Sequence, residues 1–169
     1  MCLHTGTHID APAHFLEDGH SIEKTSLTQL AGRCCVLDLT QIEGDAITRE
    51  ALEQHEAVIE KGVIVMLKTA NSALSTTAPF NPKFVFLHIS GAEYLRERGI
   101  KAVGVDYLGI ERDQPDHVTH KTLLGSQIPI VEGLRLGHVD CGRSYYFVCL
   151  PLAIQGLEAA PARAVLLPL

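Results

Sequence analysis

Residues 4–14 read His-Thr-Gly-Thr-His-Ile-Asp-Ala-Pro-Ala-His and carry most of the information on fold and chemistry. The side chains that could bind a metal ion stand at even positions: His4, His8, Asp10 and His14. In an extended chain, residues two apart point to the same face, so these four side chains can converge. The segment therefore predicts a strand followed by a turn, with one ligand-bearing face.

A helix is the alternative conformation for this segment, and it would align His4 with His8. Asp10 would then lie about 160° around the helix from His8, because successive helical residues are separated by roughly 100°. Gly6, the β-branched residues and Pro12 also disfavour a helix.

Two imidazoles with a carboxylate suit Zn²⁺, Mn²⁺ or Fe²⁺, because these ions accept nitrogen and anionic oxygen ligands.

Apolar runs along the rest of the chain predict strands at residues 34–40, 63–68, 102–106, 128–132, 145–150 and 163–167. One helix is expected at 48–61, with Thr48 as N-cap and Gly62 as the stop. A second is expected from a capping box at residues 90–93 to about Arg98, ending at Gly99. Residues 69–83 are expected to form a loop. This order predicts an α/β domain with a mixed sheet and flanking helices.

The composition restricts the class of protein. An apolar fraction of 46% and a charged fraction of 20% over 169 residues are typical of one globular domain. A net charge of −6 without any run of Lys or Arg argues against nucleic-acid binding and against an anionic membrane surface. No apolar stretch reaches the roughly 18–20 residues of a membrane helix, and the first residues do not resemble a secretion signal. We therefore expect a cytoplasmic protein.

The cysteine pattern indicates reduced thiols. The five cysteines are odd in number and contain no CxxC pair: Cys2, Cys34, Cys35, Cys141 and Cys149. The segments around residues 34–35 and 149 are apolar, so we expect these thiols to be small buried side chains in strands.

The opening segment resembles the signature of the cyclase family of metal-dependent hydrolases, His-x-Gly-Thr-His-x-Asp-x-Pro-x-His, at all seven fixed positions. Bacterial kynurenine formamidases belong to this family, and isatin hydrolases are relatives. The resemblance continues through Val-Gly-Val-Asp at 103–106, from His120 through residues 128–134, and in the closing segments 149–152 and 160–165. It covers essentially the whole chain, which we expect to form a single domain over residues 1–169.

The resemblance implies a swivelling β/β/α fold with a two-metal site. The residues at the matching ligand positions are His4, His8, Asp10, His120 and Glu132. The first three would hold one ion, and Asp10 would bridge to a second ion held also by His120 and Glu132. His14 would transfer protons. The resemblance implies one or two divalent ions, zinc or manganese, and a homodimer or higher homo-oligomer.

The implied reaction is metal-dependent hydrolysis of a small amide, with N-formylkynurenine giving kynurenine and formate in tryptophan catabolism. Isatin, or another small cyclic amide or lactone, would fit the same chemistry. The alternative of another class is a metal-stabilised domain without turnover, or an inactive paralogue. Structural zinc sites are usually closed sets rich in Cys, so an oxygen-rich set favours catalysis. Family members usually carry a few dozen residues before the motif, so we expect this chain to lack that N-terminal segment.

Several further residues have two interpretations. Glu132 alone is typical of a surface carboxylate, and His117 competes with His120 as the downstream histidine. Asp106 closes an apolar strand, where it could be functional or could cap the following turn. Asn71 and Ser72 could contact substrate or stabilise a turn. The remaining histidines are interpreted as structural or solvent-facing: His20, His55, His88 and His138.

Overall fold

The computed structural model describes residues 2–75 and 77–169. Within these residues, one mixed sheet closes into a barrel in the order β1-β7-β6-β4-β2-β8-β9. Its strands are β1 (His8–Asp10), β2 (Ala31–Leu39), β4 (Ile64–Thr69), β6 (Ala102–Val105), β7 (Ile130–Glu132), β8 (Tyr145–Pro151) and β9 (Ala159–Pro168). Two short strands, β3 (Ala46–Ile47) and β5 (Phe86–Leu87), pair separately.

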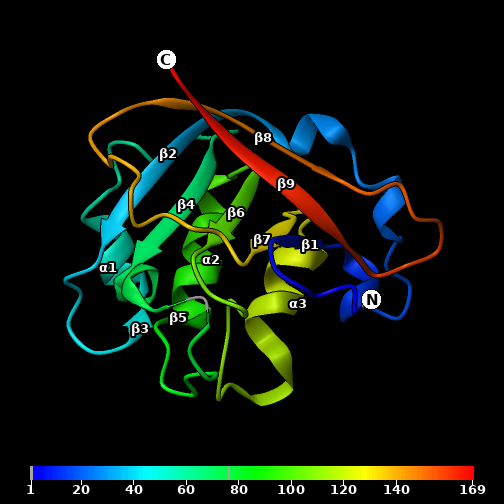
Figure 1. Ribbon diagram of the computed structural model, residues 1–169, viewed down its shortest axis with the longest axis horizontal. Coiled ribbons are helices and arrows are strands. Elements are labelled where there is room, and N and C mark those ends of the chain that lie inside the picture. The colour runs from blue at the N-terminus through cyan, green and yellow to red at the C-terminus, as the bar shows by residue number, and fades with distance from the viewer. Residues whose placement is uncertain (1, 76) are drawn as a thin grey trace.

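The pairing brings the opening motif beside segments from the last third of the sequence. β2, β4, β6 and β7 run parallel to one another, and β8 runs antiparallel to both β2 and β9. β1 lies between β7 and β9, antiparallel to each, so that His8 faces Glu132 on one side and Pro161 on the other. Figure 1 shows β1 beneath the long β9, with β7 beside it. This insertion positions the opening motif.

The hydrophobic core occupies both faces of the central strands. On β4, Val65 and Leu67 pack toward the helices, whereas Ile64 and Met66 point into the barrel. Such strands are apolar throughout because neither face meets water. Three helices pack on the face that carries Val65 and Leu67, below the sheet in Figure 1: α1 (Arg49–Glu53), α2 (Ile89–Arg98) and α3 (Val118–Gly125). None of the helices in the described residues is both long and apolar enough to cross a membrane.

The structure confirms the predicted α/β class with a mixed sheet and flanking helices. Every predicted strand is present, with its ends shifted by at most four residues. α3 was not predicted, because the polar residues of its first turns break an apolar helical period. The predicted loop at 69–83 contains a short 3₁₀ helix, Ala70–Ala73.

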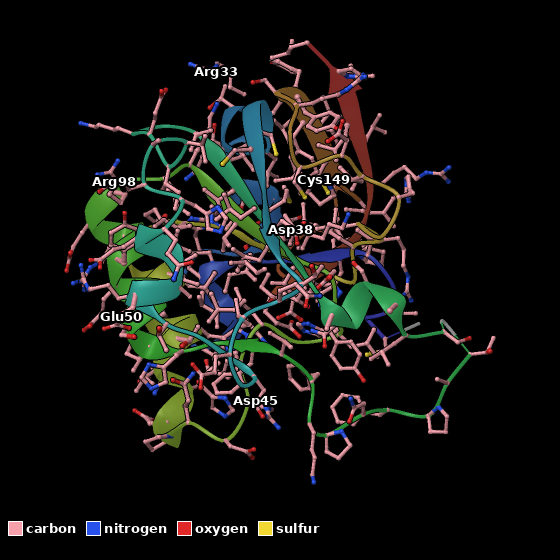
Figure 2. The ribbon with its side chains drawn as sticks, turned by 90° about the vertical axis from the view of Figure 1, so that its left-hand side faces the viewer. Arg33, Asp38, Asp45, Glu50, Arg98 and Cys149 are labelled. Atoms are coloured by element: carbon pink, nitrogen blue, oxygen red, sulfur yellow. The ribbon has the colours of Figure 1, made fainter. Side chains whose placement is uncertain are left out.

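The cysteine interpretation is also confirmed for two of the strand thiols. All five cysteines are free, and Cys34 and Cys149 are buried. Burial raises the pKa of the Cys149 thiol to about 12, which keeps it in its neutral form. Figure 2 shows Cys149 among the strands, whereas Arg33 and Arg98 lie near the outline of the molecule.

The helix predicted for residues 48–61 is wrong beyond its first turns. Thr48 is the N-cap, as expected, but α1 ends at Glu53. The guanidinium of Arg98 donates to the backbone carbonyl of Ile59 at 2.7 Å, and the Ile59 side chain is fully buried. These tertiary contacts hold residues 54–61 as successive turns and override their helix propensity.

The capping box predicted at residues 90–93 is wrong, although the helix itself is present. The N-cap of α2 is His88, whose Nδ1 accepts a hydrogen bond from the backbone N–H of Ser90 at 3.2 Å. The Ser90 hydroxyl instead accepts from the backbone N–H of Arg49, at the start of α1. The predicted end at Gly99 is confirmed, since this residue adopts the left-handed conformation of a helix C-cap at φ +66°.

Candidate metal centre

The opening motif is extended only in its middle. His8 and Asp10 belong to β1, are buried, and share a face because they are two residues apart. His4 lies in the preceding turn, and His14 ends the short 3₁₀ helix Pro12–His14. The predicted strand is thus shorter than the motif, and turns on both sides bring the outer histidines back toward β1.

The structure brings all six predicted site residues into one cluster: His4, His8, Asp10, His14, His120 and Glu132. Asp10 Oδ1 lies 3.1 Å from His4 Nδ1 and 3.5 Å from His8 Nε2. The other carboxylate oxygen of Asp10 lies 3.9 Å from His120 Nε2. Asp10 therefore stands between the upstream and the downstream histidines.

Glu132 completes the cluster from β7. Its Oε2 lies 3.4 Å from His8 Nε2, and its Oε1 lies 3.5 Å from His120 Nε2. Donor atoms held by one Zn²⁺ at about 2.0–2.1 Å in a tetrahedral arrangement are roughly 3.3 Å apart. Most of the nitrogen–oxygen distances in the cluster are near this value. Such distances are long for a hydrogen bond but suit ligand atoms that share one ion.

The hydrogen bonding of three buried atoms in the cluster indicates whether a cation fits there. In the part of the chain that the structure describes, His8 Nε2 and both carboxylate oxygens of Asp10 have no hydrogen-bond partner. The short His4–Asp10 contact is not aligned as a hydrogen bond. Leaving a buried polar group unpaired costs about 1–3 kcal/mol, and more for a charged one. A divalent cation would satisfy all three atoms, so the donor set fits a metal.

The carboxylates make the cluster attract positive charge. The neighbouring Asp10 carboxylate raises the pKa of His4. Burial opposes charge on His120, but the hydrogen bond to Glu111 and the nearby Glu132 carboxylate outweigh this effect and raise its pKa to about 9. His14 differs, because burial lowers its pKa. The lowered pKa favours the neutral form of His14, which can accept a proton.

Comparison with known proteins identifies the family. The Cyclase family model, described as "Putative cyclase", matches residues 1–112. Cyclase-like protein 1 of Arabidopsis thaliana is 34% identical over 176 residues, covering 99% of this chain and 67% of its own length. The chain belongs to the Cyclase family. Kynurenine formamidase of Bacillus anthracis is 32% identical over 171 residues, covering 100% of this chain and 78% of its own length.

Solved structures agree with this Cyclase-family assignment. One described as a potential metal-dependent hydrolase with cyclase activity has a TM-score of 0.91 and 43% sequence identity, covering 98% of this chain and 79% of its own. An isatin hydrolase bound to the product analogue thioisatinate has a TM-score of 0.84 but 21% identity, covering 100% of this chain and 74% of its own. The second likeness concerns the fold alone.

Within this Cyclase-family cluster, the geometry allows His14 two roles. Its ring centroid lies 4.3 Å from that of His4 and 5.9 Å from that of His120. One nitrogen of His14 also lies within 4.8 Å of donor atoms on Asp10 and His120, close enough to share an ion with them. His14 can therefore transfer protons beside the ligands or act as a ligand itself.

Sequence reasoning missed three residues around the cluster. Glu111 Oε2 lies 2.6 Å from His120 Nδ1, and Glu158 Oε1 lies 3.6 Å from His4 Nε2. Phe15 lies with its ring centroid 4.6 Å from that of His120. The two glutamates had no spacing signal among the other charged residues, whereas Phe15 directly follows the motif and its position could have suggested it.

Four residues that had two interpretations in the sequence are not among the six residues of the cluster: His117, Asp106, Asn71 and Ser72. His117 is exposed, and its ring stacks on Phe15 at 4.5 Å, at the outer side of the cluster. Asp106 accepts hydrogen bonds from the Thr69 backbone N–H at 2.7 Å and from the Ser72 hydroxyl at 2.5 Å. Asn71 exchanges hydrogen bonds with the backbone of residue 85. These last contacts support the turn interpretation for Asp106, Asn71 and Ser72.

Proposed function

We propose that this chain is a metal-dependent hydrolase that cleaves the amide bond of an aryl formamide such as N-formylkynurenine. The observation that carries the proposal is the buried histidine–carboxylate cluster in which His8 Nε2 and both oxygens of Asp10 have no hydrogen-bond partner among the described residues. The kynurenine formamidase relative, which aligns over the full chain, supports the substrate class.

Two groups of ligands share Asp10 in this proposal. His4, His8 and Asp10 would hold one ion, and Asp10, His120 and Glu132 would hold a second. The mixture of imidazole and carboxylate donors suits zinc or manganese. A divalent ion in such a site activates water at neutral pH and stabilises negative charge on a carbonyl oxygen.

The chain's own residues supply the proton transfer. His14 is neutral at pH 7 because burial lowers its pKa, so it can accept the proton released by the attacking water. It then donates this proton to the departing aryl amine nitrogen as the C–N bond breaks, while the new C–O bond gives formate. General acid–base catalysis of this kind contributes about 10²–10⁴-fold. The Phe15–His117 stack beside the cluster offers an apolar surface for an aromatic ring.

The experiment that tests the proposal combines metal analysis with a substrate panel. Protein purified without chelator is expected to contain one to two divalent ions per chain and to hydrolyse N-formylkynurenine. Turnover of isatin instead would assign the site to cyclic amides. Bound metal without turnover of either substrate would favour a structural role for the ions. A folded protein that takes up neither Zn²⁺ nor Mn²⁺ would refute the proposal.

A further inference from the structure

The two ring nitrogens of His120 face different carboxylates. Nε2 points into the cluster, 3.5 Å from Glu132 and 3.9 Å from Asp10. Nδ1 points away from it and lies 2.6 Å from Oε2 of Glu111. Because Glu111 engages the outer nitrogen, Nε2 is the nitrogen that remains for an ion.

Glu111 contacts His120 through two groups at once. The same Oε2 that lies beside the ring also accepts a hydrogen bond from the backbone N–H of His120 at 2.8 Å. The Glu111 side chain is only 2% exposed, so solvent competes little for these contacts. A carboxylate bound to both backbone and ring fixes the position and the rotation of the imidazole.

The residue before Glu111 acts on the other downstream member of the cluster. The backbone N–H of Ile110 donates to Oε1 of Glu132 at 2.7 Å. Two consecutive residues, outside the opening motif and outside the six predicted site residues, thus orient both His120 and Glu132. The upstream histidine of β1 differs, because among the described residues Nδ1 of His8 faces the neutral backbone carbonyl of Gly6, at 2.9 Å.

We propose that Glu111 is a positioning residue that holds His120 as the tautomer protonated on Nδ1 and so fixes Nε2 toward an ion shared with Asp10 and Glu132. This inference rests on the proposed metal site. A carboxylate that accepts the outer N–H of a histidine sets its tautomer and makes the other nitrogen a stronger ligand. Glu111 therefore increases the affinity of the downstream ion selectively.

The first test measures metal affinity in variants of Glu111. Metal-free protein is titrated with Zn²⁺ in competition with a chromophoric chelator. Glu111→Gln removes the charge and is expected to weaken one ion about 10-fold, whereas Glu111→Ala also removes the acceptor and is expected to weaken it about 100-fold. The other ion is expected to bind as in the wild type. Glu53→Gln, at a carboxylate that is 48% exposed on α1, is the matched control.

The outcomes separate this inference from the proposed function. If the wild type binds no ion, the proposed function fails. If the wild type binds two ions and both Glu111 variants bind them with unchanged affinity, only the positioning role is overturned. An equal weakening of both ions would likewise overturn the selective role of Glu111.

A second test does not depend on the folding of any variant. The ¹⁵N chemical shifts of His120 in zinc-loaded wild-type protein distinguish a protonated nitrogen from a metal-bound one. We expect Nδ1 to be protonated and Nε2 to be bound to the metal. Metal bound through Nδ1 would overturn the inference, because Glu111 would then face the wrong nitrogen.

Discussion

At the scale of single residues, Asp10 connects the upstream and the downstream histidines of the cluster. Its two oxygens face opposite ways, one toward His4 and His8 and the other toward His120. It is also almost fully buried, so no water molecule can easily replace it. A carboxylate in this position can bridge two ions, and both would depend on it.

Replacing this carboxylate is therefore expected to affect both ions. In Asp10→Ala, we expect elemental analysis to find neither ion and the rate of amide hydrolysis to fall more than about 100-fold, since metal ligation and charge stabilisation are lost together. Asp38→Asn, at an exposed carboxylate, serves as the control. An Asp10→Ala protein that retains two ions would contradict the bridging assignment.

His14 is expected to behave differently. His14→Ala should keep its metal content near normal while turnover falls by about 10²–10⁴-fold, the range of general acid–base catalysis. Metal analysis and rate measurements on the same preparation separate the two effects. Loss of metal from this variant would instead make His14 a ligand, in agreement with its place near Asp10 and His120.

The raised pKa of His120 predicts that metal uptake depends on pH. In the folded, metal-free protein this pKa is about 9, above the usual 6.5, so the proton is bound at pH 7. The protonated ring stabilises the metal-free fold below pH 6.5, and this stabilisation is lost as the pH rises to about 9. An ion must displace the proton, so affinity should rise about 10-fold per pH unit between 7 and 9 for each proton released.

Calorimetry of Zn²⁺ binding in two buffers with different ionisation enthalpies measures that proton release directly. We expect at least one proton per chain at pH 7. Affinity that is constant from pH 7 to pH 9 would show that metal uptake releases no proton from His120, and would contradict its place among the ligands.

At the scale of elements, prediction from the sequence succeeded where burial decides the conformation. The runs that form β4 and β6 are apolar on both faces, so their strand character is visible locally. It failed at α1, where the Arg98 guanidinium, distant in the sequence, holds residues 54–61 as turns. Likewise, the histidine motif was visible in its own spacing, whereas Glu111 acquires its role only through the fold.

The opening motif packs closely against the residue that follows β7, and this contact yields a prediction on Gly133. It follows β7, has φ +70°, and a Cβ there would lie 2.3 Å from the carbonyl oxygen of Gly6. The Thr7 hydroxyl donates to the Gly133 carbonyl at 2.8 Å in the same contact. Gly133→Ala should therefore separate the opening motif from β7. We expect it to lower the free energy of unfolding by about 3 kcal/mol and to weaken metal binding.

Gly156→Ala is the matched control for this contact. Gly156 has a similar φ of +76°, but a Cβ there would meet no atom within 4 Å. Its substitution carries only the backbone strain, about 1 kcal/mol. Urea unfolding of both variants measures the difference, and equal destabilisation would mean that the Gly6–Gly133 contact is unimportant.

At the scale of the whole molecule, the β8–β9 ribbon presents a strand edge and apolar side chains to solvent. Among the described residues, the pairing of β9 with β1 stops at Pro161, and beyond it β9 pairs with β8 alone. Figure 1 shows β9 extending along the outer side of the sheet to the C-terminus. Large apolar side chains are exposed on this ribbon: Tyr146, Leu150, Val165 and Leu167.

An open strand edge beside exposed apolar side chains favours self-association. We expect sedimentation equilibrium at micromolar concentration to show a homodimer or a larger assembly. Val165→Lys, on the ribbon, should shift the protein toward the monomer. Leu27→Lys, at a side chain that is 56% exposed elsewhere, should leave the assembly unchanged. A wild-type protein that is monomeric under these conditions would contradict the prediction.

The position of β1 between β7 and β9 has a consequence for protein synthesis. The ribosome delivers β1 before β7 and β9, and these neighbouring strands emerge only after more than a hundred further residues. Until then, the first histidines of the nascent chain have neither their strand partners nor the downstream members of the cluster. Pairings this distant in the sequence form slowly. We therefore expect metal loading to follow the synthesis and pairing of β7 and β9, late in the folding of this part of the chain.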